Sequence, residues 1–222
     1  MSGHRLAVLH PFDPRRDPSD HVEARLHAIL GSRPSDFDVL VVGIDRRGDL
    51  EPGGVVEIEA AGRSLAFLPV TGEGGGGFTG GLLRHLPAVR AAARGDVASV
   101  SVHAIAWAPF ARLVGRPIVL VVHDDPRADA VAGRAPFPVA LREHVALRVA
   151  DRIVAYDAEF VRRCRETHPV LAAKTELVPL AVPQSETVVS MFSDDLHLAR
   201  LWERHRRLFD AVPKGRGSHA AA

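Results

Sequence analysis

Three histidines, His10, His103 and His123, stand at the carboxyl ends of apolar runs that are typical of buried strands. The clearest run is "PIVLVVHDDP", in which six apolar residues are followed by His123, Asp124 and Asp125. Imidazole changes its charge near neutral pH and can donate or accept a hydrogen bond, whereas a carboxylate accepts hydrogen bonds. Such a set of side chains can hold a polar ligand or move a proton, so these strand ends form a candidate site.

Each of these side chains also has a plain structural interpretation. A histidine at a strand end can satisfy nearby backbone groups, and the two aspartates can cap the following loop, which is the usual role of Asp125 before a proline. Arg15 and Arg16 follow the first apolar run, and they either bind an anionic group such as a phosphate or are solvated loop charges. The residue types alone leave both interpretations open.

The apolar runs predict the strands that position these residues. Runs of Val, Ile and Leu without polar alternation are typical of strands that are buried on both faces. We expect strands at 5–10, 37–45, 97–103, 117–124, 151–157 and 175–182, and two short strands within 55–70 around a turn at Gly62. Apolar stripes at helical spacing predict helices at 21–30, 82–94, 104–115, 136–150, 158–167 and 196–212.

The ends of two of these helices carry clear signals. Asp20 with Glu23 resembles a capping box at the start of the first helix, and Gly31 stops that helix. Asp157 is placed to cap the helix that runs through Thr167. The alternation of strands and helices predicts an α/β fold, with a single Rossmann-like parallel sheet and helices on both faces. Ligands bind such sheets in the crevice beyond the carboxyl ends of the strands, which is where the three histidines would lie.

Three segments together resemble the N-terminal domain of family 4 glycosyltransferases, enzymes of the GT-B fold. In order, they are "SVHAIAWAPFARLVGRPIVLVVHD", "VADRIVAYDAEFVRR" and "KTELVPLAVP". The likeness covers residues 5–183. It implies that sugar is transferred from a nucleotide-sugar donor with retention of configuration, with no bound cofactor and no metal.

The resemblance also implies roles for individual residues. In this family the N-terminal domain mostly holds the sugar acceptor, and the histidine that matches His123 faces the transferred sugar. Asp124 matches a position that often contacts the acceptor. We expect His10, His103, Arg15 and Arg16 to surround the acceptor, which would be a sugar or a lipid-linked sugar.

The sequence departs from the family pattern in two places. The family's first strand usually leads into a Gly-Gly loop, but here the loop reads "HPFDPRRDPSD", so close approach of backbone to a diphosphate is not expected there. Too few residues follow 183 for a second Rossmann half. We therefore expect a domain at 1–183, a linker and crossing helix of the same domain at 184–212, and a disordered tail at 213–222. A partner chain or a homodimer arrangement would have to supply the donor-binding domain.

Composition narrows the function classes further. A formal net charge of +1 gives no reason to expect binding to nucleic acid. The single cysteine, Cys164, fits a cytoplasmic protein. No apolar run is long enough to span a membrane, and at most Arg84, Arg90 and Arg94 suggest peripheral membrane contact. The glycine-rich segment 71–81 lacks the Gly-Lys-Ser/Thr ending of a P-loop. The alternative to an enzyme is a non-catalytic binding or regulatory module that kept the fold.

Overall fold

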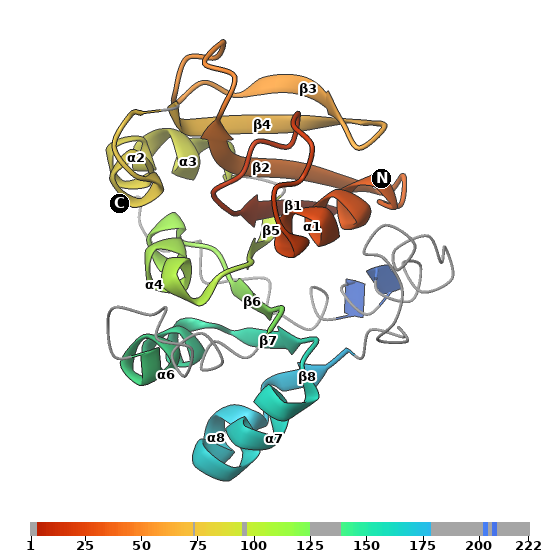
Figure 1. Cartoon of the computed structure of the whole chain (residues 1–222), viewed down its shortest axis with the longest axis vertical. Helices are drawn as coiled ribbons and strands as arrows, with labels where there is room; N and C mark the ends of the chain where they lie inside the picture. The colour runs from red at the N-terminus through yellow and green to blue at the C-terminus, as the bar shows by residue number, and fades with distance from the viewer. Residues whose placement is uncertain are drawn as a thin grey trace, which may run out of the picture.

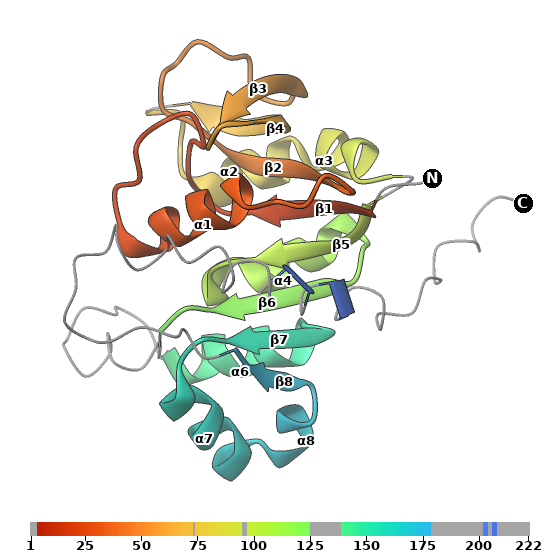
Figure 2. The ribbon, with the colours of Figure 1, turned by 90° about the vertical axis from the view of Figure 1, so that its right-hand side faces the viewer.

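A single sheet of eight strands organises the molecule. The computed structural model describes residues 4–72, 74–94, 97–124, 139–178, 202–203 and 206–207. Along the sheet the strands lie in the order β3-β4-β2-β1-β5-β6-β7-β8, as Figures 1 and 2 show. The strands are β1 (His4–Leu9), β2 (Phe37–Asp45), β3 (Val56–Ala60), β4 (Arg63–Gly72), β5 (Val97–Val102), β6 (Ile118–Val122), β7 (Arg152–Ala155) and β8 (Thr175–Leu177).

All neighbouring strands in this sheet are parallel except the β3–β4 pair, which is an antiparallel hairpin. Gly62 stands in the hairpin turn at φ 69°, a backbone conformation that glycine adopts without a steric penalty. The α/β class, the parallel sheet and the two short strands around Gly62 are thereby confirmed. Because the other strands are parallel, their carboxyl ends meet at one edge of the sheet.

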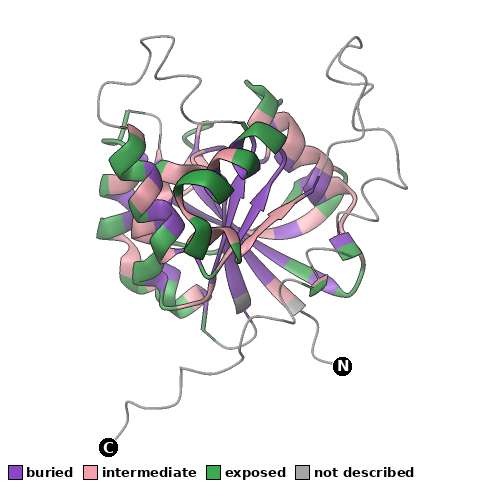
Figure 3. Cartoon of the chain, turned by 90° about the horizontal axis from the view of Figure 1, so that it is seen from below, coloured by how far each residue is buried: buried purple, intermediate pink, exposed green. Residues whose placement is uncertain are grey.

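Helices cover both faces of the sheet, and Figure 3 shows the buried strands between them. They are α1 (His21–Gly31), α2 (Phe78–Arg84), α3 (Leu86–Ala92), α4 (Ala108–Ala111), α6 (Val139–Val149), α7 (Ala158–Thr167) and α8 (Pro169–Ala172), with short 3₁₀ turns at Ile105–Trp107 and Arg112–Val114. One apolar core joins α1 to the sheet, and a second core joins α2, α3, α4, α6 and α7 to the opposite face. The predicted two-sided arrangement is confirmed.

The predicted caps form as expected. The Asp20 carboxylate accepts a hydrogen bond of 2.8 Å from the Glu23 amide, and the Glu23 carboxylate in turn accepts one of 2.7 Å from the Ser19 amide. Asp157 caps α7 by accepting a 2.8 Å hydrogen bond from the Phe160 amide. Each cap satisfies backbone donors that a helix cannot pair internally.

The predicted helix at 82–94 is instead two helices, α2 and α3. Pro87 stands in the first turn of α3, where its lack of an amide hydrogen costs nothing, but it cannot continue the hydrogen-bond ladder of a preceding helix. Helix α2 therefore ends at Arg84, and α3 begins at Leu86. Helix α2 also starts earlier than expected, at Phe78, within the glycine-rich segment.

Two adjacent glycines in α2 give a matched pair of predictions. A methyl group at Gly81 would lie 2.3 Å from the Val70 carbonyl oxygen, whereas one at Gly80 would meet nothing within 4 Å. We expect Gly81→Ala to destabilise the protein by about 1–3 kcal/mol through overpacking. Gly80→Ala should stabilise it by about 0.5–1 kcal/mol, because alanine loses less backbone entropy in a helix. Thermal unfolding measures both changes, and equal effects of the two substitutions would contradict the packing of α2 on β4.

The described residues of the C-terminal segment are helical and pack on the α1 face. Trp202 is 2% exposed, and its indole N–H donates to the Ile29 carbonyl at 3.1 Å and the Ser32 hydroxyl at 3.0 Å. Its ring lies 5.2 Å from that of Phe37. The expected return of the closing helix onto the domain is confirmed at Trp202. Residues 184–201 and the predicted tail at 213–222 lie outside the described residues.

Within the described ranges, no helix is both long enough and apolar enough to cross a membrane.

Candidate functional site

The three histidines lie together at the carboxyl edge of the sheet. His10 follows β1, His103 follows β5 and His123 follows β6, and these three strands are neighbours. All three side chains are buried, with 8%, 5% and 6% of their surface exposed, respectively. The ring of His103 lies between the other two, 6.4 Å from that of His10 and 5.2 Å from that of His123.

Hydrogen bonds connect two of these imidazoles to a serine. Nδ1 of His103 lies 2.9 Å from Nε2 of His123, and Nε2 of His103 lies 3.0 Å from the Ser101 hydroxyl oxygen. Ser101 is on β5 and His103 directly follows this strand, two residues later, and both border a cavity that is also lined by Leu26, Ile29 and Leu30 of α1. The result is a buried polar chain that runs from the interior to the sheet edge.

The first turns of α1 close over the end of β6. The His21 ring contacts the Asp124 carboxylate at 2.5 Å. Arg25 donates a 3.3 Å hydrogen bond to the His123 carbonyl and lies 3.7 Å from the Asp124 carboxylate. Asp124 is 55% exposed, so the polar edge reaches solvent at this carboxylate while the imidazoles stay beneath it.

Tyr156, the residue after β7, borders the site on the other side. Its ring lies 5.3 Å from that of His123. Within the described part of the chain its buried hydroxyl has no hydrogen-bond partner, and neither does the buried Nε of Arg25. Burial raises the pKa of the Tyr156 phenol far above its usual value, and the nearby Arg25 opposes this only in part, so the phenol keeps its proton.

His10 is neutral at physiological pH. Burial lowers its pKa to about 4, although the nearby carboxylates of Asp20 and Glu23 act in the opposite direction. Its Nδ1 is buried and has no hydrogen-bond partner within the residues that the structure describes. A neutral imidazole packed against His103 adds little charge to the site.

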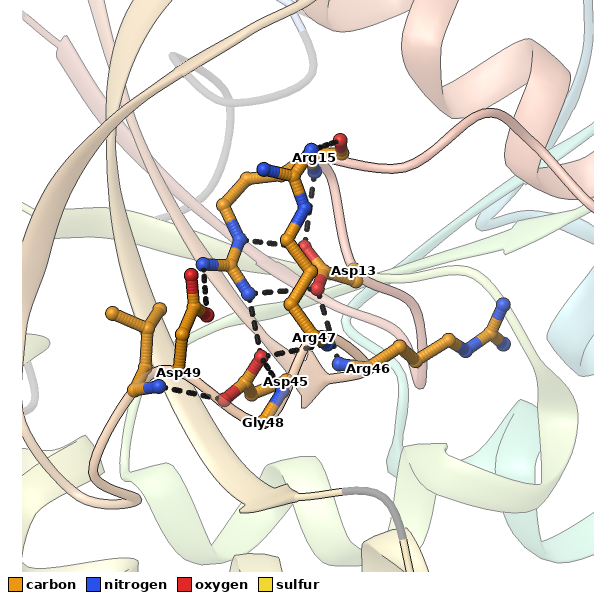
Figure 4. A network of polar contacts seen from close by, with 8 residues as sticks. Asp13, Arg15, Asp45, Arg46, Arg47, Gly48 and Asp49 are labelled. Carbon is orange, nitrogen blue, oxygen red and sulfur yellow. Dashed lines mark hydrogen bonds and ion pairs between the residues drawn. The ribbon is translucent and has the colours of Figure 1, made fainter.

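Arg15 lies in a network of carboxylates and backbone amides, which Figure 4 shows. Its Nε and Nη2 donate to Asp13 at 2.9 and 2.8 Å, a second Nη2 hydrogen bond of 2.6 Å reaches Asp45, and Nη1 donates to Asp49 at 2.6 Å. Four of its five N–H groups are therefore used by carboxylates of the protein itself. The side chain is only 8% exposed.

This network fixes the loop after β1 to the loop after β2. Asp45 also accepts hydrogen bonds from the amides of Arg47, Gly48 and Leu50, and Asp13 accepts one from the Arg46 amide. The sequence predicts Arg15 to contact a sugar acceptor, but its donors are committed to carboxylates, and we leave it out of the candidate site. Arg16 is an exposed loop residue.

Two residues at the site that the sequence analysis did not name, Ser101 and Tyr156, nevertheless leave a local signal in the sequence. "SVSVH" places Ser101 and His103 on one face by strand periodicity, and Tyr156 follows an apolar strand as the histidines do. His21 and Arg25 join the site through tertiary contacts for which the sequence holds no local signal. Asp125 lies outside the described residues.

No group of three or more His, Cys, Asp or Glu side chains is arranged to hold a metal ion in the part of the chain that the structure describes.

No protein-family model matches the chain, and no curated protein matches it. Solved structures that are similar in fold include an epimerase and a plant glycosyltransferase. UDP-N-acetylglucosamine 2-epimerase from Rickettsia bellii is 8% identical, with a TM-score of 0.50 over 91% of this chain and 48% of the epimerase. UGT2 of Phytolacca americana, solved with UDP-2fluoro-glucose and pterostilbene, is 12% identical, with a TM-score of 0.48 over 83% of this chain and 56% of that protein. The chain spans about half the length of each.

At such low identity a similarity concerns the fold alone. The chain has an α/β Rossmann-like fold of the GT-B-like type, as the sheet order and the likeness to the epimerase indicate. The comparisons do not single out family 4 among proteins with this fold, so membership of that family stays a prediction from the sequence.

Proposed function

We propose that this chain is the acceptor-binding half of a glycosyltransferase of family 4 type. The observation that supports this best is the gathering of His10, His103 and His123 at the carboxyl edge of three adjacent strands. Parallel α/β sheets bind their ligands at this edge. Imidazoles beside an exposed carboxylate suit the hydroxyl groups of a sugar, which both donate and accept hydrogen bonds.

In this proposal His123 positions the transferred sugar, and Asp124 accepts a hydrogen bond from a hydroxyl of the acceptor. The diphosphate leaving group and the nucleotide of the donor bind to a second domain that faces this one. A second lobe is needed because a single open sheet edge does not exclude water from the reacting sugar. The chain alone is therefore expected to bind a sugar but not to transfer one.

A non-catalytic binding module is the second candidate, and the burial of the imidazoles favours it. His103 and His123 are only 5% and 6% exposed, so a reactant would reach them only after a neighbouring segment moves. A module of this kind would bind a carbohydrate or a partner protein through the exposed groups at the edge, such as Asp124, and would not use the histidines for chemistry.

The test is sugar transfer with and without His123. We expect His123→Ala to lower the transfer rate about 10- to 100-fold when a donor domain is supplied, because a hydrogen bond that positions the sugar is lost. The measurement is transfer of radiolabelled sugar from UDP- and GDP-sugars by the purified chain mixed with candidate donor domains. His144→Gln serves as the control, since that histidine is on α6 and contacts only the ring of His168 among the aromatic residues described.

Three outcomes separate the candidates. Unchanged transfer in His123→Ala removes this residue from the mechanism. Tight binding of a nucleotide sugar by the chain alone contradicts the half-enzyme proposal, because no donor domain is then needed. Carbohydrate binding that persists in His123→Ala, without transfer under any pairing, supports the non-catalytic module.

A further inference from the structure

Charge is unevenly distributed along this chain. The whole sequence holds 28 lysine and arginine residues against 27 aspartate and glutamate residues. Between residues 74 and 123, however, it holds five arginines and a single carboxylate, Asp96. The helices of this segment, α2, α3 and α4, pack on the face of the sheet opposite to α1 (Figure 1). The excess of positive charge therefore lies on one side of the sheet.

The exposed surface of this region contains few residue types. Every exposed residue on α2, on α3 and on the turn at Arg112–Val114 is an arginine, leucine, proline, alanine or glycine. Leu83 is 46% exposed and Leu113 is 37% exposed. Helix α3 contacts the turn through Arg90, whose Nε donates a 2.6 Å hydrogen bond to the Leu113 carbonyl. We call this surface the basic face, and its members are Leu83, Arg84, Arg90, Arg94, Arg112 and Leu113.

Three arginines of the basic face have no carboxylate partner within the described part of the chain. Neither Arg84 nor Arg94 makes a side-chain hydrogen bond or an ion pair with the described residues, and Arg90 is bonded only to a backbone carbonyl. Arg112 differs, because it pairs with Asp151 at 3.1 Å. The positive charges of the other three are therefore not neutralised by these parts of the protein.

Helix α7 shows how an exposed arginine is neutralised elsewhere in the molecule. Arg162 pairs with both Glu159 and Glu166, at helical spacings of three and four residues. The sequence places no carboxylate three or four residues from Arg84, Arg90 or Arg94. These side chains are therefore available to an anion outside the protein.

We propose that the basic face binds the surface of a membrane that contains anionic lipids. Arg84, Arg90 and Arg94 contact lipid phosphates, and Leu83 and Leu113 enter the boundary between head groups and acyl chains. Each basic residue gains from the negative surface potential of such a membrane, and each apolar side chain adds buried area. This is attachment to the surface of the bilayer and needs no spanning helix.

The composition of the basic face favours a lipid surface over a nucleic acid. Proteins bind single-stranded nucleic acid with grooves that combine basic residues and aromatic side chains, on which the bases stack. No exposed residue of α2, α3 or the Arg112–Val114 turn is aromatic, and two of the exposed side chains are leucines. Exposed leucines among unpaired arginines are typical of surfaces that lie in the membrane interface.

Co-sedimentation of the purified chain with lipid vesicles tests the proposal. We expect binding to vesicles of phosphatidylcholine with phosphatidylglycerol, and little binding to phosphatidylcholine alone. Binding should be lost in about 1 M salt, where the screening length falls to about 3 Å. The triple substitution Arg84→Gln, Arg90→Gln and Arg94→Gln should weaken binding about 100-fold, because each arginine contributes about a factor of five.

A second triple substitution with the same change of net charge is the control. Arg16, Arg63 and Arg165 are exposed on the loop after β1, on the β3–β4 hairpin and on α7. Replacing these three with glutamine should leave vesicle binding within about twofold of wild type, because charges beyond the screening length contribute little. Circular dichroism checks that both triple variants are folded. Equal binding by the two variants, or no binding of the wild-type chain to anionic vesicles, would overturn the proposal.

Leu83→Ala combined with Leu113→Ala separates a lipid surface from other polyanions. The double substitution keeps the charge, so it should weaken binding to anionic vesicles about 10-fold and leave any binding of single-stranded RNA unchanged. RNA binding that is tighter than vesicle binding, with no effect of the leucine substitutions on either, would assign the basic face to nucleic acid and overturn the proposal.

The vesicle assay needs no sugar and no donor domain, so its outcome is independent of the transfer assay. Membrane binding without sugar transfer would contradict the proposed function and leave the role of the basic face intact. Sugar transfer without membrane binding would do the reverse.

Discussion

Replacing Arg15 with methionine is expected to lower the free energy of unfolding by about 3–5 kcal/mol. Methionine keeps most of the apolar volume but removes the positive charge between Asp13 and Asp45, whose side chains are both fully buried. Two buried carboxylates would then lack their shared cation, and breaking a buried ion pair from one side costs more than the pair itself contributes. Urea denaturation followed by circular dichroism measures the change.

The pH dependence of this effect has a definite sign. Burial raises the pKa of Asp13 and Asp45, but hydrogen bonds from Arg15 and from backbone amides more than offset this, so that both pKa values lie below the usual 3.8. Their contribution to stability is therefore present above the unfolded pKa and is lost as the pH falls through the folded values. In Arg15→Met the carboxylates should take up protons at higher pH, so the difference from wild type should shrink below about pH 4.

Arg16→Met is the matched control for this prediction. Arg16 is the next residue in the same loop, and its side chain is exposed, so the substitution should change stability by no more than about 0.5 kcal/mol. If Arg15→Met lowered the free energy of unfolding as little as Arg16→Met, the network in Figure 4 would not stabilise the fold as we describe. Binding of an external anion by Arg15 would then be the better interpretation.

Trp202→Ala should be about as destabilising as Arg15→Met, with a loss of about 3–5 kcal/mol. The substitution empties a site beside Phe37 and leaves the Ile29 carbonyl without the indole donor. Circular dichroism in urea is the suitable measurement, because it does not depend on tryptophan fluorescence. Trp202→Phe should lose less, since it keeps an aromatic ring and removes only the indole part.

Arg206→Ala provides the comparison within the same segment. Arg206 pairs with Asp36 at 2.7 Å, but the two side chains are 34% and 52% exposed, and exposed pairs contribute about 0–1 kcal/mol. A loss in Arg206→Ala as large as that in Trp202→Ala would mean that charge, and not burial of the indole, holds this segment on the domain.

The sequence predicts the strands well because a buried parallel strand leaves a local signature. The run "FDVLVVGID" becomes β2 with the same bounds, and Asp20 and Asp157 cap helices as expected. The adjacency of the histidines depends on the order of strands, which follows from the predicted fold class and not from any local run of residues. That His10, His103 and His123 meet is therefore a prediction from topology.

What the sequence does not predict are contacts between segments far apart in the chain. Arg15 donates hydrogen bonds to Asp45 and Asp49, which are 30 and 34 residues away. Nothing in the sequence around Arg15 distinguishes it from a solvated or a ligand-binding arginine. The contact of His21 with Asp124 spans 103 residues. Such pairs are fixed by how the loops after β1, β2 and β6 come together, which tertiary packing decides.

The hydrogen bond from Trp202 to Ile29 joins residues that are 173 positions apart. During synthesis on a ribosome, α1 and β2 emerge long before Trp202 does, so their apolar surface stays uncovered at this place while the later strands are translated. Closing so large a loop is entropically costly and slow. Nascent chains of this protein are therefore expected to engage chaperones until the region around Trp202 has left the exit tunnel.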